Sequence, residues 1–184
     1  MSFWQVVPFF PQFMNEKQIE PYWLGLFMSV LSMSFLFAAL ITGKYILLYI
    51  DRLTCCYLSS ILLLINLIGL GSLYFLQDKM QIIYLTNFFQ IIGGIGNALN
   101  NSSAMAIVSS YDENKLEYIS YLETCLGLGG LLGPLGGSIL HYFFGFLGPF
   151  YGLAIFYLLV IIILLKTSDR VPDDSYKKSS SKNR

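Results

Sequence analysis

Charge is scarce in this sequence: Lys, Arg, Asp and Glu together make up 12% of the 184 residues, and the formal net charge is zero. Because the few basic residues do not cluster on an amphipathic stretch, the sequence offers no footprint for nucleic acid. The single histidine, His141, excludes the multi-histidine metal centres of membrane desaturases and related oxidases. A glycine-rich phosphate loop and a nucleophile with a base partner are also absent. We therefore predict a protein that is not an enzyme and that holds no metal or cofactor.

Cysteine is equally sparse. Cys55 and Cys56 are adjacent and Cys125 is distant, which makes a poor disulfide framework and lacks the spacing of a metal site. All three lie in or beside apolar runs. We predict that they pack as small hydrophobic residues.

Apolar residues, in contrast, are abundant: they make up 55% of the chain and give a mean hydropathy of +0.63. This composition is typical of membrane proteins. A helix crosses the hydrocarbon core of a bilayer with about 20 apolar residues, and it satisfies its own backbone polar groups. Five stretches meet this requirement: residues 22–43, 55–76, 82–109, 118–144 and 149–165.

Short polar joints connect these five spans, at residues 44–52, 77–79, 111–117 and 145–148. Such tight connections make consecutive helices antiparallel. The predicted fold is therefore all-α, a polytopic transmembrane helix bundle that occupies residues 15–166.

The two ends of the chain differ from the bundle. Residues 1–14 are apolar but too short to cross a membrane, and Pro8 and Pro11 interrupt them. We interpret them as the remnant of a first transmembrane helix. Residues 167–184 are rich in Ser, Lys, Asp and Asn, which predicts a disordered tail.

The basic residues predict the orientation, because cytoplasmic segments retain Lys and Arg. If the five spans alternate in direction, Lys17 and Lys79 lie on one side and the remaining basic residues lie on the other. These remaining residues are Lys44, Arg52, Lys115, Lys166, Arg170, Lys177, Lys178, Lys182 and Arg184. We therefore predict a multi-pass integral membrane protein whose C-terminal tail is cytosolic.

The third span carries a polar stripe. Gln90, Gly94, Asn97 and Asn101 are spaced so that they fall on one face of the helix. Polar side chains in a membrane helix face the bundle or a hydrated cavity, because they need partners. The stripe therefore serves either hydrogen bonding between helices or a solute pathway.

Glu123 is the one carboxylate clearly inside a predicted span, about a turn from its cytosolic end. An ionisable group there indicates a function, either as a proton carrier or as a counter-charge for a cationic solute. The alternative is structural, because a carboxylate near a helix N-terminus is stabilised by the helix dipole and reaches headgroup water.

The fourth span carries a glycine row. Gly129, Gly133 and Gly137 recur at four-residue spacing, and small residues in such a row let another helix backbone approach closely. Pro134 lies inside the row and predicts a fixed bend. Together they indicate a helix that packs tightly while a neighbour rocks against it.

Four sequence patterns, in this order and spacing, resemble those of the major facilitator superfamily. Residues 133–138, Gly-Pro-Leu-Gly-Gly-Ser, resemble its fifth-helix antiporter motif, and residues 90–98 resemble its fourth-helix pattern. Residues 8–11 resemble the end of a first helix. Gly43 and Arg52 resemble what is left of a cytosolic loop motif between the second and third helices. The closest likeness is to vesicular amine and polyamine transporter relatives.

The resemblance implies a solute transporter. Members of this superfamily typically have twelve spans in two six-helix halves, and substrate sits between the halves near the midplane. By that comparison the chain resembles the N-terminal half, with helices two to six and the remnant of the first. We therefore expect either an incomplete gene product, which we favour, or a chain that works beside a partner.

Two departures from the superfamily pattern bear on mechanism. Gln90 stands where the fourth-helix pattern has an arginine implicated in proton coupling, which argues against proton-driven exchange. In the loop motif, Leu47 and Ile50 replace a gating aspartate and a second glycine, which argues against the usual charge-relay gate.

The sequence thus leaves two functions open. The first is transport of a small organic solute along the polar stripe, with Glu123 as a further candidate on the pathway. The second is a non-transporting membrane interaction protein, in which the same stripe and glycine row serve assembly with another helical subunit. The expected partners are the lipid bilayer, a small-molecule solute and, for either function, the missing C-terminal half or another helical subunit.

Overall fold

The structure, a computed structural model, describes residues 10–109 and 115–168. Within these residues it contains helices and turns but no strand, which confirms the all-α prediction. The elements are α2 (Phe10–Glu16), α3 (Tyr22–Ile41), a π-helical turn (Thr42–Ile46), α4 (Leu47–Tyr49), α5 (Arg52–Ser72), a 3-10 turn (Leu73–Phe75), α6 (Lys79–Val108), α7 (Lys115–Phe144) and α8 (Leu147–Ser168).

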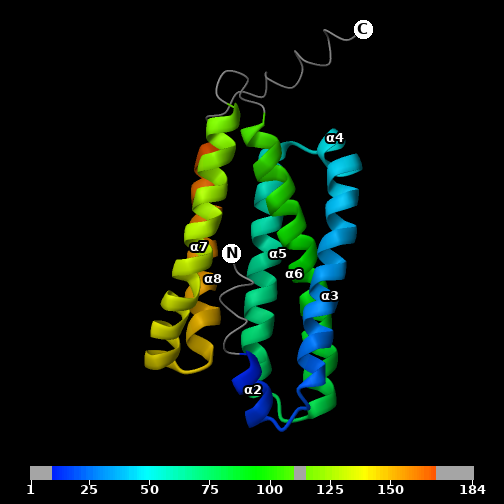
Figure 1. Cartoon of the computed structure of the whole chain (residues 1–184), viewed down its shortest axis with the longest axis vertical. Coiled ribbons are helices and arrows are strands. Elements are labelled where there is room, and N and C mark those ends of the chain that lie inside the picture. The colour runs from blue at the N-terminus through cyan, green and yellow to red at the C-terminus, as the bar shows by residue number, and fades with distance from the viewer. Residues whose placement is uncertain (1–9, 110–114, 169–184) are drawn as a thin grey trace, which may run out of the picture.

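The long helices form the up-and-down bundle that the short joints predict. Figure 1 shows α3, α5, α6, α7 and α8 running along one common direction, each reversed relative to the helix before it. Four helical segments in the described residues are long and apolar enough to cross a membrane. They are Tyr22–Tyr49, Arg52–Phe75, Lys79–Val108 and Leu147–Lys166.

The remaining predicted span, residues 118–144, lies in α7. This helix has 30 residues and is therefore long enough to cross a bilayer. It falls outside the set of four because its glycines, Pro134, Glu123 and His141 dilute its apolar character. That α7 crosses the membrane stays a prediction.

The helix bounds differ from the predicted ones at three places. The first joint is shorter than residues 44–52, because the apolar residues after Gly43 continue the helix through the π-helical turn to Tyr49. The helix near the N-terminus extends past residue 14 to Glu16, and it admits Pro11 because a first helical turn needs no N–H there. α8 ends at Ser168, beyond the predicted limit of 166. The rest of the predicted tail, and residues 1–9, lie outside the described residues.

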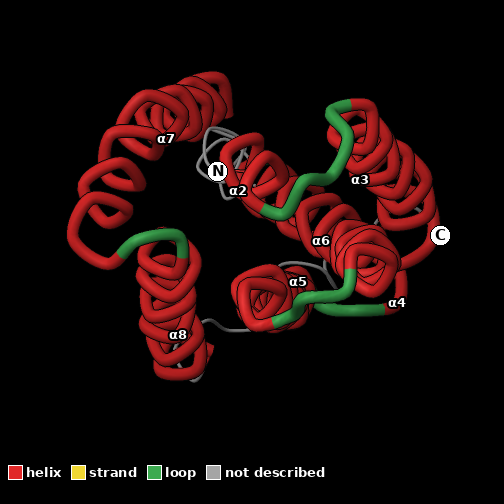
Figure 2. The backbone as a smooth tube through the Cα atoms, turned by 90° about the horizontal axis from the view of Figure 1, so that it is seen from below, coloured by secondary structure: helices red, strands yellow, loops and turns green. Residues whose placement is uncertain are grey.

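α6 is the central helix of the bundle. It packs most extensively against α5 on one side and α3 on the other (Figure 2). α8 packs against α5 and then against α7, whereas α7 makes little contact with α6. α7 therefore stands apart from the helix that precedes it in the chain.

The cysteines reflect this difference. Cys55 and Cys56 are buried on α5, and the Cys56 Sγ lies 3.1 Å from the Ser103 Oγ of α6. These two behave as the small core residues that the sequence predicts. Cys125, however, is exposed, because α7 has so few neighbours.

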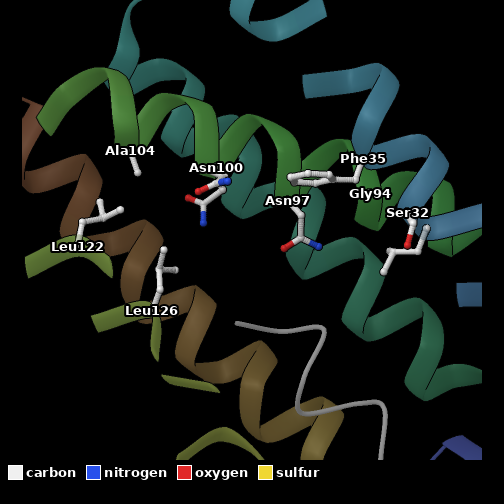
Figure 3. Close-up of a pocket in the computed structure, with 10 residues that line it drawn as sticks. Ser32, Phe35, Gly94, Asn97, Asn100, Ala104, Leu122 and Leu126 are labelled. Carbon is white, nitrogen blue, oxygen red and sulfur yellow. The ribbon is translucent and has the colours of Figure 1, made fainter. Parts of the chain in front are cut away.

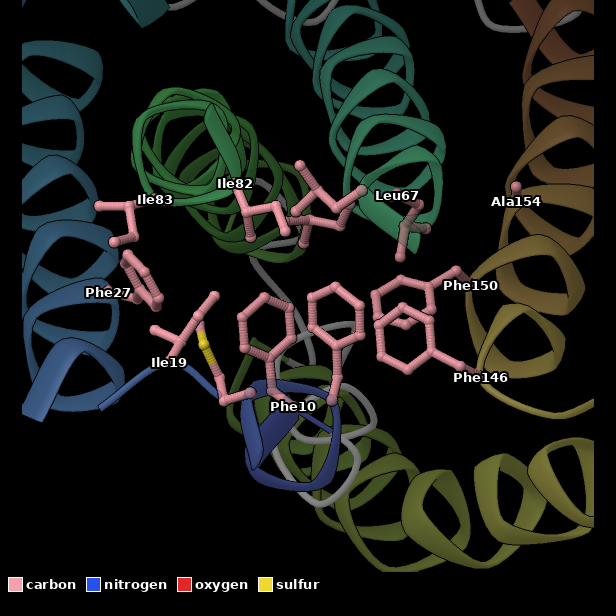
Figure 4. Close-up of a cluster of buried hydrophobic side chains, with 13 residues drawn as sticks. Phe10, Ile19, Phe27, Leu67, Ile82, Ile83, Phe146, Phe150 and Ala154 are labelled. Atoms are coloured by element: carbon pink, nitrogen blue, oxygen red, sulfur yellow. The ribbon is translucent and has the colours of Figure 1, made fainter. Parts of the chain in front are cut away.

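One end of the bundle is closed by an apolar cluster built around α2. Phe10 and Phe13 of α2 are almost fully buried, and they meet Phe27 of α3 and Phe146 of the turn before α8 (Figure 4). The rings of Phe13 and Phe146 stack with centroids 4.4 Å apart. The short helix α2 thus ties α8 to the α3 side of the bundle.

The basic residues that the structure describes lie at the two ends. The ends of α3 and α8 and the starts of α5 and α7 meet at one end of Figure 1, and they carry Lys44, Lys166, Arg52 and Lys115. The opposite end carries Lys17 and Lys79. Many large apolar side chains on the outer faces are exposed, such as those of Phe37, Leu40, Tyr84 and Phe156. An apolar belt between charged ends is the surface expected of a protein that lies in a bilayer.

Candidate cavity between α3, α6 and α7

The space between α6 and its distant neighbour α7 contains a cavity of about 470 Å³. α3 closes one side of it (Figure 3). The lining residues are Leu31, Ser32 and Phe35 of α3, Gly94, Asn97, Asn100, Asn101 and Ala104 of α6, and Leu122 and Leu126 of α7.

The cavity exists because α6 is held close to α3 but not to α7. A Cβ added to Gly94 would lie 2.8 Å from the Leu31 carbonyl oxygen of α3, so the two backbones are in direct contact there. The Ser34 Oγ of α3, which donates to the Leu31 carbonyl oxygen of its own helix at 2.9 Å, also lies 3.5 Å from the Gln90 carbonyl oxygen of α6. One turn beyond Gly94, α6 presents the amide side chains of Asn97 and Asn100 to the cavity (Figure 3).

Three asparagines supply the polar groups of the cavity. The Asn97 Nδ2 donates to the Gly93 carbonyl oxygen of its own helix at 2.9 Å, which leaves its oxygen and one N–H available. The Asn100 Oδ1 lies 3.5 Å from the Ser59 Oγ of α5, but that hydroxyl donates to the Cys56 carbonyl oxygen at 2.7 Å, so the Asn100 amide keeps its N–H groups and most of its accepting capacity. Asn101 is exposed, and its amide has no hydrogen-bond partner among the described residues. The cavity therefore offers both hydrogen-bond donors and acceptors in an otherwise apolar setting.

Comparison with models of known protein families identifies the family of this chain. The family model of the Major Facilitator Superfamily matches residues 1–183. The chain belongs to the major facilitator superfamily. Members of the superfamily are transporters rather than enzymes, and they are integral membrane proteins that act on small solutes. Neither a comparison with curated proteins nor one with solved structures found a match.

Of the four residues predicted for the solute pathway of this superfamily member, two line the cavity. They are Asn97 and Asn101. Gln90 is buried on the same helix, about two turns before Asn97, and it is not among the residues that line the cavity. Glu123 is exposed on α7 and is not among the lining residues, whereas its neighbour Leu122 is.

Three polar or aromatic lining residues were missed by the sequence reasoning. Asn100 has a detectable signal, because Asn97, Asn100, Asn101 and Ala104 follow the spacing i, i+3, i+4, i+7 of one helical face. Ser32 and Phe35 lie in a helix that is apolar all round, so nothing in the pattern of α3 distinguishes its cavity face.

The superfamily's fourth-helix pattern has a clear structural role. Gly94 contacts the backbone of α3. Gly93 and Gly96 lie against the side chains of Asn66 and Leu63 of α5, so close that no room is left for a side chain of their own. Any Cβ at these positions would meet atoms at 3.1 Å or closer. The glycines of α6 therefore let it pack against two helices at once.

The fifth-helix motif has a different setting. Gly133 and Gly137 are buried and Gly129 is half-buried, whereas Gly136 has nothing within 4 Å of an added Cβ. α7 runs through Pro134 without a break, and Figure 2 shows that its path is curved.

The close contact between α7 and α8 is made by glycines that the sequence analysis did not select. An added Cβ at Gly148 would lie against the Leu140 carbonyl, and one at Gly152 would lie 2.6 Å from the Leu140 Cδ1. Gly145, with a φ of 65°, adopts the left-handed conformation that ends α7, and its N–H donates to the His141 carbonyl at 2.8 Å. The α7–α8 hairpin thus depends on small residues in α8 and in the turn.

The loop-motif residues lie at the end of the bundle nearest the cavity. Gly43 is exposed within the π-helical turn, with open space around it. The Arg52 Nη1, at the start of α5, donates to the Ala106 carbonyl oxygen in the last turn of α6 at 2.8 Å. Carbonyls in a last helical turn lack intrahelical partners and carry a partial negative charge, so a guanidinium stabilises them. The Ser109 Oγ donates to the same carbonyl oxygen at 3.2 Å, so Arg52 and Ser109 together hold the end of α6 that carries the asparagines.

Proposed function

We propose that the chain moves a small organic solute across a membrane, and that the solute binds in the cavity between α3, α6 and α7. The observation that supports this most strongly is the placement of three asparagine side chains toward one cavity in a helix that is long and apolar enough to span a bilayer. Uncompensated amides in such a helix are costly, so they are expected where a solute or water pairs with them. In this proposal Asn97, Asn100 and Asn101 contact the solute.

The roles of Gln90 and Glu123 stay predictions. Both lie outside the lining of the cavity, so in this proposal neither contacts the bound solute. Gln90 lies where α3 and α6 meet, because its carbonyl oxygen is 3.5 Å from the Ser34 Oγ of α3.

Uptake into liposomes tests the proposal. The full chain is reconstituted, and uptake of radiolabelled neutral, cationic and anionic organic solutes is compared with uptake into protein-free liposomes. We expect uptake of at least one solute, with a loss of about tenfold in Asn101→Leu and in Asn97→Leu, because each removes a hydrogen-bonding group from the cavity.

The matched control is Asn87→Leu. Asn87 lies on the same helix, but its Nδ2 donates to the Ile83 carbonyl of α6 at 2.9 Å and it is not in the cavity. This variant should keep the uptake of the original protein. The proposal would be contradicted if Asn97→Leu and Asn101→Leu took up as much solute as Asn87→Leu. It would also be contradicted if the original protein gave no uptake above that of protein-free liposomes for any solute.

We also propose that one end of the bundle is cytosolic, because cytoplasmic segments retain Lys and Arg. This is the end that carries Lys44, Arg52, Lys115 and Lys166. Single cysteines at Lys44 and at Lys79, in a background without the native cysteines, test the orientation with a membrane-impermeant maleimide. The reagent applied from the extracytoplasmic side should label Lys79→Cys but not Lys44→Cys. The reverse pattern would invert the topology without affecting the proposed site.

A further inference from the structure

The cavity also restricts the chemistry of its ligand, an inference that rests on the proposed function. We propose that the cavity between α3, α6 and α7 binds an uncharged, hydroxyl-rich organic solute, such as a polyol or a monosaccharide, in preference to an organic cation or anion.

The first argument is the charge of the lining. The lining residues that the structure describes are apolar or neutral and polar, and none of them carries a formal charge. An ion that leaves water for such a site loses its hydration without gaining a counter-charge, and this cost is large in an apolar environment. A neutral solute avoids it.

The carboxylate that follows a lining residue of α7 does not change this argument. Glu123 follows the lining residue Leu122 in α7, yet its side chain is exposed and is not part of the lining. On α7 the lining consists of Leu122 and Leu126, which lie one turn apart. The α7 wall of the cavity is therefore apolar, so a cationic solute of the amine type would meet no carboxylate there.

The second argument is the kind of hydrogen bonding that is left open. After their internal bonds, Asn97 keeps an oxygen and an N–H, Asn100 keeps two N–H groups and most of the accepting capacity of its oxygen, and Asn101 keeps its whole amide. The Ser32 hydroxyl donates to the Met28 carbonyl at 2.9 Å and thus has only acceptor positions for a ligand. The cavity therefore presents donors and acceptors side by side.

Hydroxyl groups match such a mixture, because each one both donates and accepts. An ammonium group donates only and a carboxylate accepts only, so either ion would leave part of the amide groups unpaired when the cavity loses its water. Unpaired polar groups of this kind are costly and are a strong source of discrimination between ligands.

The third argument is the shape and size of the apolar remainder. Phe35 and Leu31 of α3 and the two leucines of α7 give the cavity an aromatic and an aliphatic wall (Figure 3). Its volume of about 470 Å³ lies within the range of small-molecule sites, which is about 300–1,000 Å³. Apolar walls around a few neutral polar groups suit a carbon ring or chain whose hydroxyls point to one side.

Saturation-transfer difference NMR on the full chain in nanodiscs tests the preference, because it detects weak ligands directly. The probes are sorbitol, tetraethylammonium and benzoate at equal concentrations. We expect a saturation-transfer signal for sorbitol, and an excess of glucose should reduce it by competing for the same cavity. Both ions should give at most a background signal. Affinity for sorbitol should fall about tenfold in Asn101→Leu and in Asn100→Leu, and it should be unchanged in Asn87→Leu.

A gain of function keeps the test independent of variants that fail to fold. Asn101→Asp places a carboxylate of nearly the same shape in the cavity, so it should lower the affinity for sorbitol and create a signal for tetraethylammonium. Binding of tetraethylammonium or benzoate, but not of sorbitol, by the original protein would overturn the inference. So would a sorbitol signal that is equal in Asn101→Leu.

The outcomes separate this inference from the proposed function. If sorbitol binds with the expected variant pattern but no solute is taken up by proteoliposomes, the cavity is a neutral-solute site and the transport proposal fails. If uptake of an organic ion is observed and is lost in Asn101→Leu, transport through the cavity stands and the preference for uncharged solutes is wrong.

Discussion

α6 and α7 are both helices of 30 residues, both are rich in glycine, and they have opposite settings in the bundle. α6 lies between α3 and α5 and buries residues along its length, whereas α7 buries only Gly133 and Gly137 of its own residues. The space that α7 leaves beside α6 is the candidate solute cavity. The tightly packed helix α6 therefore positions the candidate binding groups, and the loosely packed helix α7 provides the opposite wall.

The glycines of the two helices express the same difference. A Cβ on Gly94 of α6 would meet the Leu31 carbonyl oxygen and the Phe35 nitrogen of α3 at 2.8 and 2.9 Å. Gly127, Gly130 and Gly136 of α7 have nothing within 4 Å of such an atom. In α6 glycine is needed for contact, and in α7 these glycines face open space.

The largest effect should come from breaking the α6 side of this comparison with Gly94→Ala. The added methyl group meets backbone atoms of α3, which cannot rotate away as a side chain can. Overpacking costs about 1–3 kcal/mol and sometimes more, and we expect a loss of about 3 kcal/mol in the free energy of unfolding. Titration with sodium dodecyl sulfate, followed by tryptophan fluorescence, measures it. A loss below about 1 kcal/mol would show that α3 and α6 separate easily.

The next effect should come from Arg52→Met, which removes the bond to the Ala106 carbonyl while keeping much of the side-chain volume. Hydrogen bonds to charged groups contribute about 1.5–3 kcal/mol, and the lower end applies because Arg52 is half-exposed. We expect a loss of about 1.5 kcal/mol and a lower affinity of the cavity for its solute, since the end of α6 becomes less ordered. Arg52→Lys should recover part of both. Unchanged stability in Arg52→Met would mean that α6 ends without help from α5.

A smaller loss is expected for Asn66→Leu on the α5 side of α6. The Asn66 Nδ2 donates to the Phe89 carbonyl oxygen at 2.6 Å across the helix interface. Hydrogen bonds between membrane helices contribute about 0.6 kcal/mol on average, because their partners find alternatives in the separated state. We therefore expect a loss of about that size in the same titration. A loss as large as that of Gly94→Ala would show that this polar contact, rather than close packing, holds α5 to α6.

The sequence predicts the helices well because their signals are long. Runs of about 20 apolar residues, separated by short polar joints, place every long helix to within a few residues. The predicted joint at residues 44–52 is too long because the segment after Gly43 is itself apolar and continues the helix. Helix ends in a membrane protein depend on capping contacts such as the one at Arg52, and these are not visible in hydropathy.

The site is predicted only in part, because one helix face shows which residues share a side but not which helix lies opposite. Asn97 and Asn101 were identified from the stripe on α6, and they line the cavity. Gln90 belongs to the same stripe yet lies outside the cavity, because α3 covers that part of α6. Ser32 and Phe35 line it only because α3 crosses α6 at Gly94, a contact between segments about 60 residues apart.

The smallest effect is expected for Gly136→Ala on α7. The residue is exposed, and the new methyl group meets no described atom within 4 Å, so there is nothing for it to displace. Alanine is also the better helix former, by about 1 kcal/mol in water, so stability should be unchanged or slightly higher. The same detergent titration measures this in parallel with Gly94→Ala, and the difference between the two variants is the quantitative form of the comparison. If Gly136→Ala instead costs as much as Gly94→Ala, a further helix lies against this face of α7 in the membrane, and the open setting of its glycines is wrong.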